Sequence, residues 1–196
     1  MKDIIQMRIS LQDSNPEIWR VIQVAENTTF FELHHIIQIT MGWQNYHLFE
    51  FNLEGYRIGE VSEDFRFEGY GSDEVIDSKD TKLKEVISGP KDIINYQYDF
   101  GDDWEHQLQV QKFLAKDKAV VYPVCLEGEM RCPPEDCGGI YSFYEYLAIL
   151  KNKKHPEHKE MVTWFPKKYD PAHFDIDAVN MQLQKLDKYI KKWLGR

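Results

Sequence analysis

The chain has 196 residues, of which 42% are hydrophobic and 14% aromatic, so it can bury the core of one globular domain. Its formal net charge of −9 disfavours nucleic acid as a partner, because nucleic-acid binders neutralise phosphates with Lys and Arg. No apolar run approaches the roughly 20 residues that span a bilayer, and the N-terminus lacks a signal-peptide stretch. Three cysteines, an odd number, argue against a secreted disulfide framework. We therefore expect a cytoplasmic protein with no membrane association.

Charge is unevenly distributed along the chain. Acidic residues gather in the middle, whereas the C-terminal quarter is rich in lysine, including Lys188, Lys191 and Lys192. A solvated helical surface is the simplest interpretation of these lysines. Direct binding of DNA through them is the weaker alternative.

Apolar and polar residues alternate over residues 5–11, 18–24 and 47–53, which predicts three strands. Thr29 and Glu32 have the spacing of a capping box, and an apolar stripe follows them as far as Gly42, so a helix is expected there. Residues 60–82 are polar and predict a long exposed loop. A short helical turn follows over residues 83–87, and residues 93–100 and 104–114 predict a hairpin around residues 101–103.

In the C-terminal part, Ser142 and Glu145 form a second capping box, which predicts a helix from residue 142 to about 150. A short helix is expected over residues 157–164, and a last helix is expected to begin after Asp175 and to run to Trp193. The predicted fold class is α+β, a mostly antiparallel sheet with helices packed on it and a β-grasp-like order in the N-terminal part. Residues 1–150 are assigned to this domain, and residues 151–196 to a helical extension packed on it.

Two dense segments, residues 96–106 and 132–139, combine carboxylates, a ring or a thiol, and glycines. In the first, strand alternation places His106 on the same face as Trp104, pointing inward. This histidine either is a buried residue bonded to a carboxylate or a backbone carbonyl, or converges with nearby carboxylates on a ligand or metal. The carboxylates in turn either shape turns and cap amides, or form a hard oxygen site for Mg²⁺ or Mn²⁺. The members of that candidate site are Asp99, Asp102, Glu135 and Asp136.

The three cysteines are Cys125, Cys132 and Cys137, and none forms a C-x2-C pair. A structural zinc ion would need a fourth ligand, for which His106, His155 and His158 are candidates. The alternative is that the thiols are small buried residues in a reduced protein. The spacing alone does not require a metal.

Five segments fall in an order and spacing that closely resemble the plasmid pRiA4b ORF-3-like family. They are residues 16–20, 33–43, 47–51, 98–106 and 132–139. The resemblance extends from Ile4 to about Leu150 and implies an α+β domain of unknown function. It also implies a link with mobile DNA, since the family includes "TnpR" passenger proteins of insertion elements. The six arginines are dispersed, however, whereas a serine recombinase surrounds its serine with arginines.

Two functions follow from these observations. The leading prediction is a non-enzymatic binding or interaction domain, whose partner is a protein or a small ligand and whose surface comprises residues 99–106 and 132–139. The rival is a divalent-metal-dependent hydrolase or nuclease in which a carboxylate cluster holds the metal and His106 acts as base. The hydrolase requires the two dense segments to meet in space.

Overall fold

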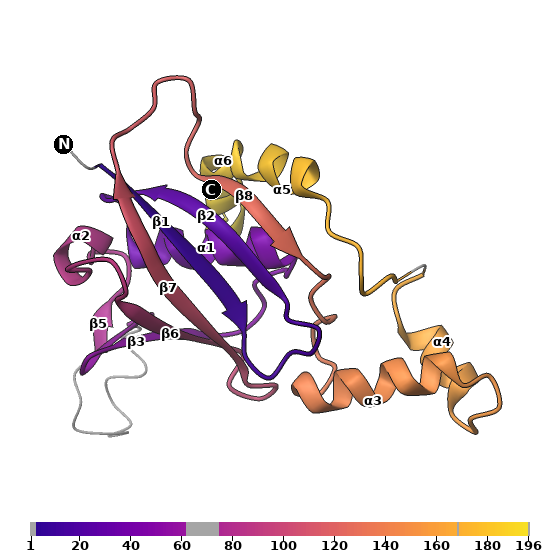
Figure 1. Ribbon diagram of the computed structural model, residues 1–196. Helices are drawn as coiled ribbons and strands as arrows, with labels where there is room; N and C mark the ends of the chain where they lie inside the picture. The colour runs from indigo at the N-terminus through magenta and orange to yellow at the C-terminus, as the bar shows by residue number, and fades with distance from the viewer. Residues whose placement is uncertain (1–2, 62–74, 168, 196) are drawn as a thin grey trace.

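The computed structural model describes residues 3–61, 75–167 and 169–195. In this part of the chain, one eight-stranded sheet has the order β5-β4-β3-β6-β7-β1-β2-β8, and helix α1 lies against one of its faces (Figure 1). The strands are β1 (Ile4–Leu11), β2 (Trp19–Ala25), β3 (Phe49–Leu53), β4 (Tyr56–Gly59), β5 (Val75–Asp77), β6 (Ile93–Tyr98), β7 (Trp104–Leu114) and β8 (Val124–Glu129). The helices are α1 (Phe30–Met41), α2 (Leu83–Val86), α3 (Gly139–Lys151), α4 (His158–Trp164), α5 (Ile176–Leu183) and α6 (Leu186–Trp193).

The sheet confirms the predicted α+β class. Strand β1 pairs antiparallel with both β2 and β7, and β4–β5 is the parallel pair of the described sheet. All five predicted strands are present, and β6 and β7 form the predicted hairpin, with Tyr98 opposite Trp104. Strands β4, β5 and β8, which the sequence did not predict, also belong to the sheet. Within the predicted loop over residues 60–82, residues 75–77 instead form β5, and residues 62–74 lie outside the described part of the chain.

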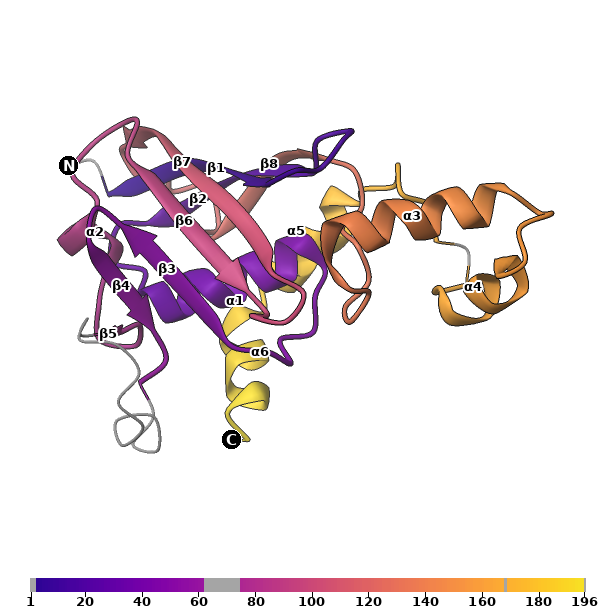
Figure 2. The same ribbon diagram turned by 90° about the horizontal axis from the view of Figure 1, so that it is seen from below.

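Helix α1 begins and ends as its sequence predicts. Thr29 accepts a hydrogen bond from the Glu32 amide, the Glu32 side chain accepts one from the Thr29 amide, and Gly42 closes the helix with φ 88°. All α1 residues except Glu32 are buried. A helix that is buried on all sides must be covered on the side away from the sheet. Helices α5 and α6 provide this cover, and Figure 2 shows them beside α1.

Two predictions about the C-terminal helices were wrong. Helix α3 begins at Gly139, three residues before the expected start, and its N-cap is Gly138 rather than Ser142. Asp102, which is distant in sequence, accepts a hydrogen bond from the Gly138 amide, so this helix start depends on a tertiary contact. The predicted last helix is capped by Asp175 as expected but is divided at residues 184–185 into α5 and α6.

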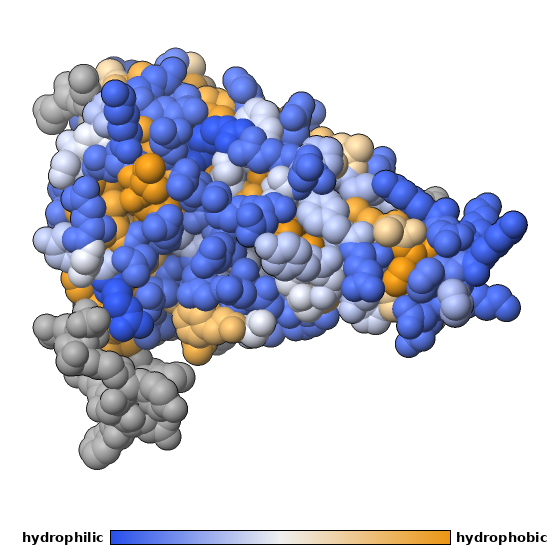
Figure 3. All heavy atoms as spheres, turned by 60° about the horizontal axis from the view of Figure 1, so that its bottom comes forward, coloured by the Kyte–Doolittle hydropathy of each residue, from blue (hydrophilic) through white to orange (hydrophobic). Residues whose placement is uncertain are grey.

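Helices α3 and α4 form an arm that projects away from the sheet (Figures 1 and 2). The face shown in Figure 3 is mainly hydrophilic, and its apolar residues form small separate patches. Among the described residues, every helix is too short or too polar to cross a bilayer. The lysines considered as a DNA-binding surface lie exposed on α6, with Lys191 and Lys192 in its last turn.

Candidate functional site

The two dense segments of the sequence meet in space. The turn between β6 and β7 lies against the loop before α3, where the Gly138 amide donates to Asp102 Oδ2 over 3.0 Å. Gly139 approaches this turn so closely that a Cβ atom at its position would lie 2.6 Å from the Asp102 carbonyl oxygen. The contact that the hydrolase interpretation requires is therefore present.

Three side chains converge at this junction. His47 Nε2 lies 3.0 Å from Asp136 Oδ1 and 3.4 Å from Asp99 Oδ2, and one potential ligand atom from each residue falls within 4.8 Å of the others. We call His47, Asp99 and Asp136 the carboxylate–histidine cluster. Asp99 is buried and Asp136 is exposed. The Nε2 atom of His47 is shielded from solvent, yet it makes no hydrogen bond despite these short distances.

Two of the three separations within the cluster fit ligand atoms that share a divalent ion. Nitrogen and oxygen ligands about 2.1 Å from one ion lie roughly 3.0 Å apart at octahedral angles and roughly 3.4 Å apart at tetrahedral angles. The 3.0 Å distance from His47 Nε2 to Asp136 matches the octahedral separation, and the 3.4 Å distance to Asp99 matches the tetrahedral one. Among the described residues, His47 is the only basic group within ion-pair distance of Asp99 or Asp136. A mixed imidazole and carboxylate set suits Mn²⁺ or Zn²⁺ better than Mg²⁺.

Glu135 connects the loops that carry the cluster. Its Oε1 accepts hydrogen bonds from the Gln44 amide over 2.6 Å and from the Tyr98 hydroxyl over 3.1 Å. The same hydroxyl accepts a bond from the Tyr46 amide. These bonds join the segment before β3, strand β6 and the loop before α3, so they hold His47 beside its two carboxylate neighbours.

The other acidic candidates contact backbone rather than the cluster. Asp102 Oδ2 accepts from the Gly138 amide, and Glu135 Oε1 accepts from the Gln44 amide. Asp99 both contacts backbone and belongs to the cluster. Its Oδ1 accepts a hydrogen bond from the Gly101 amide, and its Oδ2 faces His47. Of the four predicted carboxylates, the structure therefore brings two into the cluster and uses the other two to shape the loops.

His106 lies in the core, as strand alternation predicts. Its ring packs 5.1 Å from the Trp43 ring, and its Nδ1 lies 3.0 Å from the Trp104 carbonyl oxygen. Burial lowers the pKa of His106 to about 4, so the ring is neutral at pH 7. This arrangement is the predicted buried histidine bonded to a backbone carbonyl. His106 is not part of the cluster of ligand atoms.

The three cysteines are buried and free. Burial raises the pKa of Cys125 and Cys132 to about 11 and that of Cys137 to about 12, which keeps the thiols protonated. In the described part of the chain, no cysteine belongs to a group of three potential metal ligands. His155 and His158, the further zinc candidates, lie in the α3–α4 arm.

Sequence reasoning missed His47 as a site residue, because it appeared to be the first residue of a strand. Strand β3 instead begins at Phe49, and His47 lies in the segment that leads into it. Phe49 pairs with Tyr98, the residue before Asp99, so the pairing of β3 with β6 brings His47 to the cluster. In the sequence, His47 is only a histidine two residues before a strand. Nothing in that position links it to Asp99 or Asp136.

The close approach of Gly139 allows a stability test. Gly139 and Gly55 both have positive φ, at 82° and 91°, but a Cβ atom at Gly55 would meet nothing within 4 Å. Each change to Ala should cost about 1–2 kcal/mol of backbone strain. Gly139→Ala should cost more because its Cβ also clashes with Asp102. Urea unfolding of both variants measures the difference, and equal losses would contradict the close approach.

Comparison with known proteins gives a consistent result. Residues 3–178 match the family model described as plasmid pRiA4b ORF-3-like protein. The chain is 28% identical over 193 residues to the uncharacterized protein y4hQ of Sinorhizobium fredii, covering 97% of this chain and 94% of that one. It also resembles the crystal structure of protein MM3350 of unknown function from Methanosarcina mazei Go1. That match has a TM-score of 0.79 and 32% identity, and it covers 89% of this chain and 96% of the other. The chain therefore belongs to the plasmid pRiA4b ORF-3-like family.

Proposed function

We propose that this protein is a metal-dependent binding domain: it holds one divalent transition-metal ion at the carboxylate–histidine cluster and binds a ligand beside it. The observation that carries the proposal is the convergence of His47, Asp99 and Asp136. The three residues come from three separate segments of the chain, and Glu135 fixes the loops around them. This proposal refines the binding domain predicted from the two dense segments.

The charges of the cluster support a cation as its occupant. Two carboxylates that converge without a Lys or Arg partner among the described residues repel each other. A divalent ion would remove this repulsion and would bind His47 Nε2, which makes no hydrogen bond although it lies at ion-pair distance from both carboxylates. Three protein ligands leave coordination positions open, as in metal sites that also bind water or substrate.

Calorimetric titration of Mn²⁺ and Zn²⁺ into the metal-free protein tests the proposal. We expect one ion per chain, and we expect Asp136→Asn to weaken binding by about 100-fold or more, since loss of an outer-shell partner alone costs 10–100-fold. Asp103→Asn is the matched control, because Asp103 lies in the same turn as Asp99 but outside the cluster. Binding that is absent in the wild type, or equal in both variants, would refute the proposal.

A metal-assisted hydrolase is a second candidate, favoured by the open coordination positions beside a pocket of about 400 Å³. His106 lies in the core and outside the cluster, so a metal-bound water would have to supply the nucleophile. Hydrolysis of bis(p-nitrophenyl) phosphate by the Mn²⁺-loaded protein tests this function. Activity that Asp136→Asn abolishes and Asp103→Asn retains would support it, whereas no activity in the loaded wild type would leave a binding domain.

A further inference from the structure

The pocket beside the cluster has features of a small-molecule site. Its volume is about 400 Å³, within the range of about 300–1,000 Å³ that is usual for ligand pockets. His47 and Asp99 of the cluster form part of its wall, so a ligand in the pocket can reach an ion held there. The pocket therefore adjoins two of the three residues that would hold the ion.

Exposed apolar side chains gather around this pocket. Tyr46 is 66% exposed and Phe100 is 52% exposed, and both line the pocket with Leu48 and Trp193, which are also exposed. Large apolar residues that lie singly on a surface need no explanation, but a group of them around one cavity marks a binding site. Three of the four are aromatic, which favours a planar ligand that can stack on a ring.

Trp193 is held in place before any ligand binds. Its Nε1 donates to the Asn45 carbonyl oxygen over 3.3 Å, and its ring lies 5.7 Å from the Phe31 ring and 5.2 Å from the His35 ring. Helix α6 therefore presents a fixed aromatic wall to the pocket. A wall that is already ordered reduces the entropy lost on binding.

The charges that line the pocket make its ligand preference depend on the metal. Glu60 and Asp99 are acidic lining residues, and no Lys or Arg is present among the described lining residues. Lys79 lies nearby and forms an ion pair with Glu60, with 3.8 Å between Lys79 Nζ and Glu60 Oε1. An anion would be repelled from the metal-free pocket, but a divalent ion would balance the two cluster carboxylates and attract a hard oxygen ligand.

We infer that this pocket takes a planar aromatic ligand that carries an oxyanion: the oxyanion coordinates the ion at the cluster, and the ring stacks on the wall formed by Tyr46, Phe100 and Trp193. The inference rests on the proposed function, because it requires the ion to be bound. A nucleoside phosphate and an aromatic carboxylate share this chemistry.

Titration of the Mn²⁺-loaded protein with AMP and with salicylate tests the inference and distinguishes the two sources. At least one probe should bind with the ion present and not without it, and more tightly than inorganic phosphate. Phe100→Ala and Trp193→Ala should each weaken binding by about 10-fold, the effect of losing one stacked ring. Trp164→Ala is the matched control, since Trp164 is also partly exposed but lies on α4, away from the pocket.

The outcomes separate this inference from the proposed function. Stoichiometric Mn²⁺ binding with no affinity for either probe would overturn the inference and leave the metal site intact. Equal probe affinity in the wild type and in both ring variants would also overturn it, because the oxyanion alone would then bind. Binding of the aromatic cation benzylamine to the metal-free protein would show that the pocket prefers cations to oxyanions, and this would refute the inference. Absence of Mn²⁺ binding, measured without probes, would refute both.

Discussion

The folded protein should lose most of its stability between about pH 6.5 and pH 4. His34, His35 and His106 are completely buried, and burial lowers the pKa of each, to about 4 for His35 and His106. In the unfolded chain a histidine has its ordinary pKa of about 6.5. Within this window the unfolded state therefore binds protons that the folded state does not, and stability falls as the pH falls.

The size of this effect follows from the two pKa values. A shift of about 2.5 units corresponds to roughly 3 kcal/mol for each of His35 and His106. Because the stability of a whole domain is about 5–15 kcal/mol, unfolding by acid is expected close to pH 4. Above pH 6.5 the contribution is fully present, so these three residues should add no pH dependence to the stability there.

Urea unfolding of the metal-free protein at several pH values measures the effect. The free energy of unfolding should fall by about 3–4 kcal/mol per pH unit near the middle of the window, as expected for three histidines. His106→Gln should reduce this slope by about a third, whereas the exposed His173→Gln should leave it unchanged. A slope below about 1 kcal/mol per pH unit would contradict the neutral buried state of these rings.

Arg20→Met should destabilise the fold by about 3–5 kcal/mol, because it removes a buried group that bonds several carbonyls at once. The Arg20 side chain donates to four backbone carbonyl oxygens, over 2.6–2.8 Å. The acceptors are the carbonyl oxygens of Trp19, Thr40, Glu129 and Met130. The guanidinium carbon lies 3.9 Å from the centre of the Phe174 ring. Arg20 thus ties β2 to the end of α1 and to the end of β8, and its loss leaves buried acceptors without donors.

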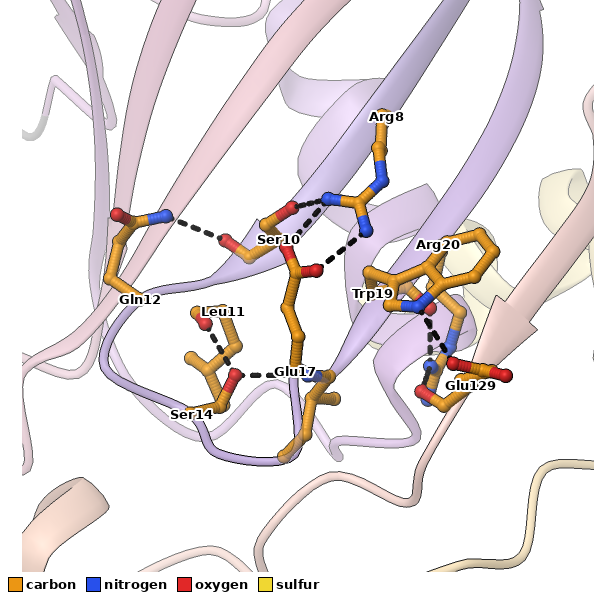
Figure 4. Close-up of polar contacts among 10 residues, drawn as sticks. Arg8, Ser10, Leu11, Gln12, Ser14, Glu17, Trp19, Arg20 and Glu129 are labelled. Carbon is orange, nitrogen blue, oxygen red and sulfur yellow. Dashed lines mark hydrogen bonds and ion pairs between the residues drawn. The ribbon is translucent and has the colours of Figure 1, made fainter.

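Arg8 provides the control, and Figure 4 shows both arginines near the β1–β2 turn. Arg8 pairs with Glu17 over 2.6 Å, but both side chains are partly exposed. Solvent screens such a pair, so Arg8→Met should cost less than about 1 kcal/mol. Arg20→Lys should recover only part of the loss, because an ammonium group cannot reproduce the planar fork. Denaturant unfolding at neutral pH compares the three variants, and similar costs for Arg8→Met and Arg20→Met would refute the assignment.

Local structure was largely predictable from the sequence, since its signals lie within a few residues. The capping box at Thr29 and Glu32 and the alternation around Trp104 and His106 both gave correct elements. The capping box at Ser142 did not, because Asp102 from another part of the chain bonds the Gly138 amide and the helix starts earlier. The local signal failed where a distant residue bonds an amide at an earlier helix start.

The sequence by itself determined the family resemblance, the α+β class and two of the three segments that form the candidate site, but not the segment that carries His47. Only the tertiary structure decided which carboxylates converge: Asp99 and Asp136 join His47, while Asp102 and Glu135 accept bonds from backbone amides. The physical reason is the range of the interactions. Alternation and capping depend on neighbours along the chain, whereas the cluster depends on the pairing of β3 with β6 and on the approach of the loop before α3 to the β6–β7 turn.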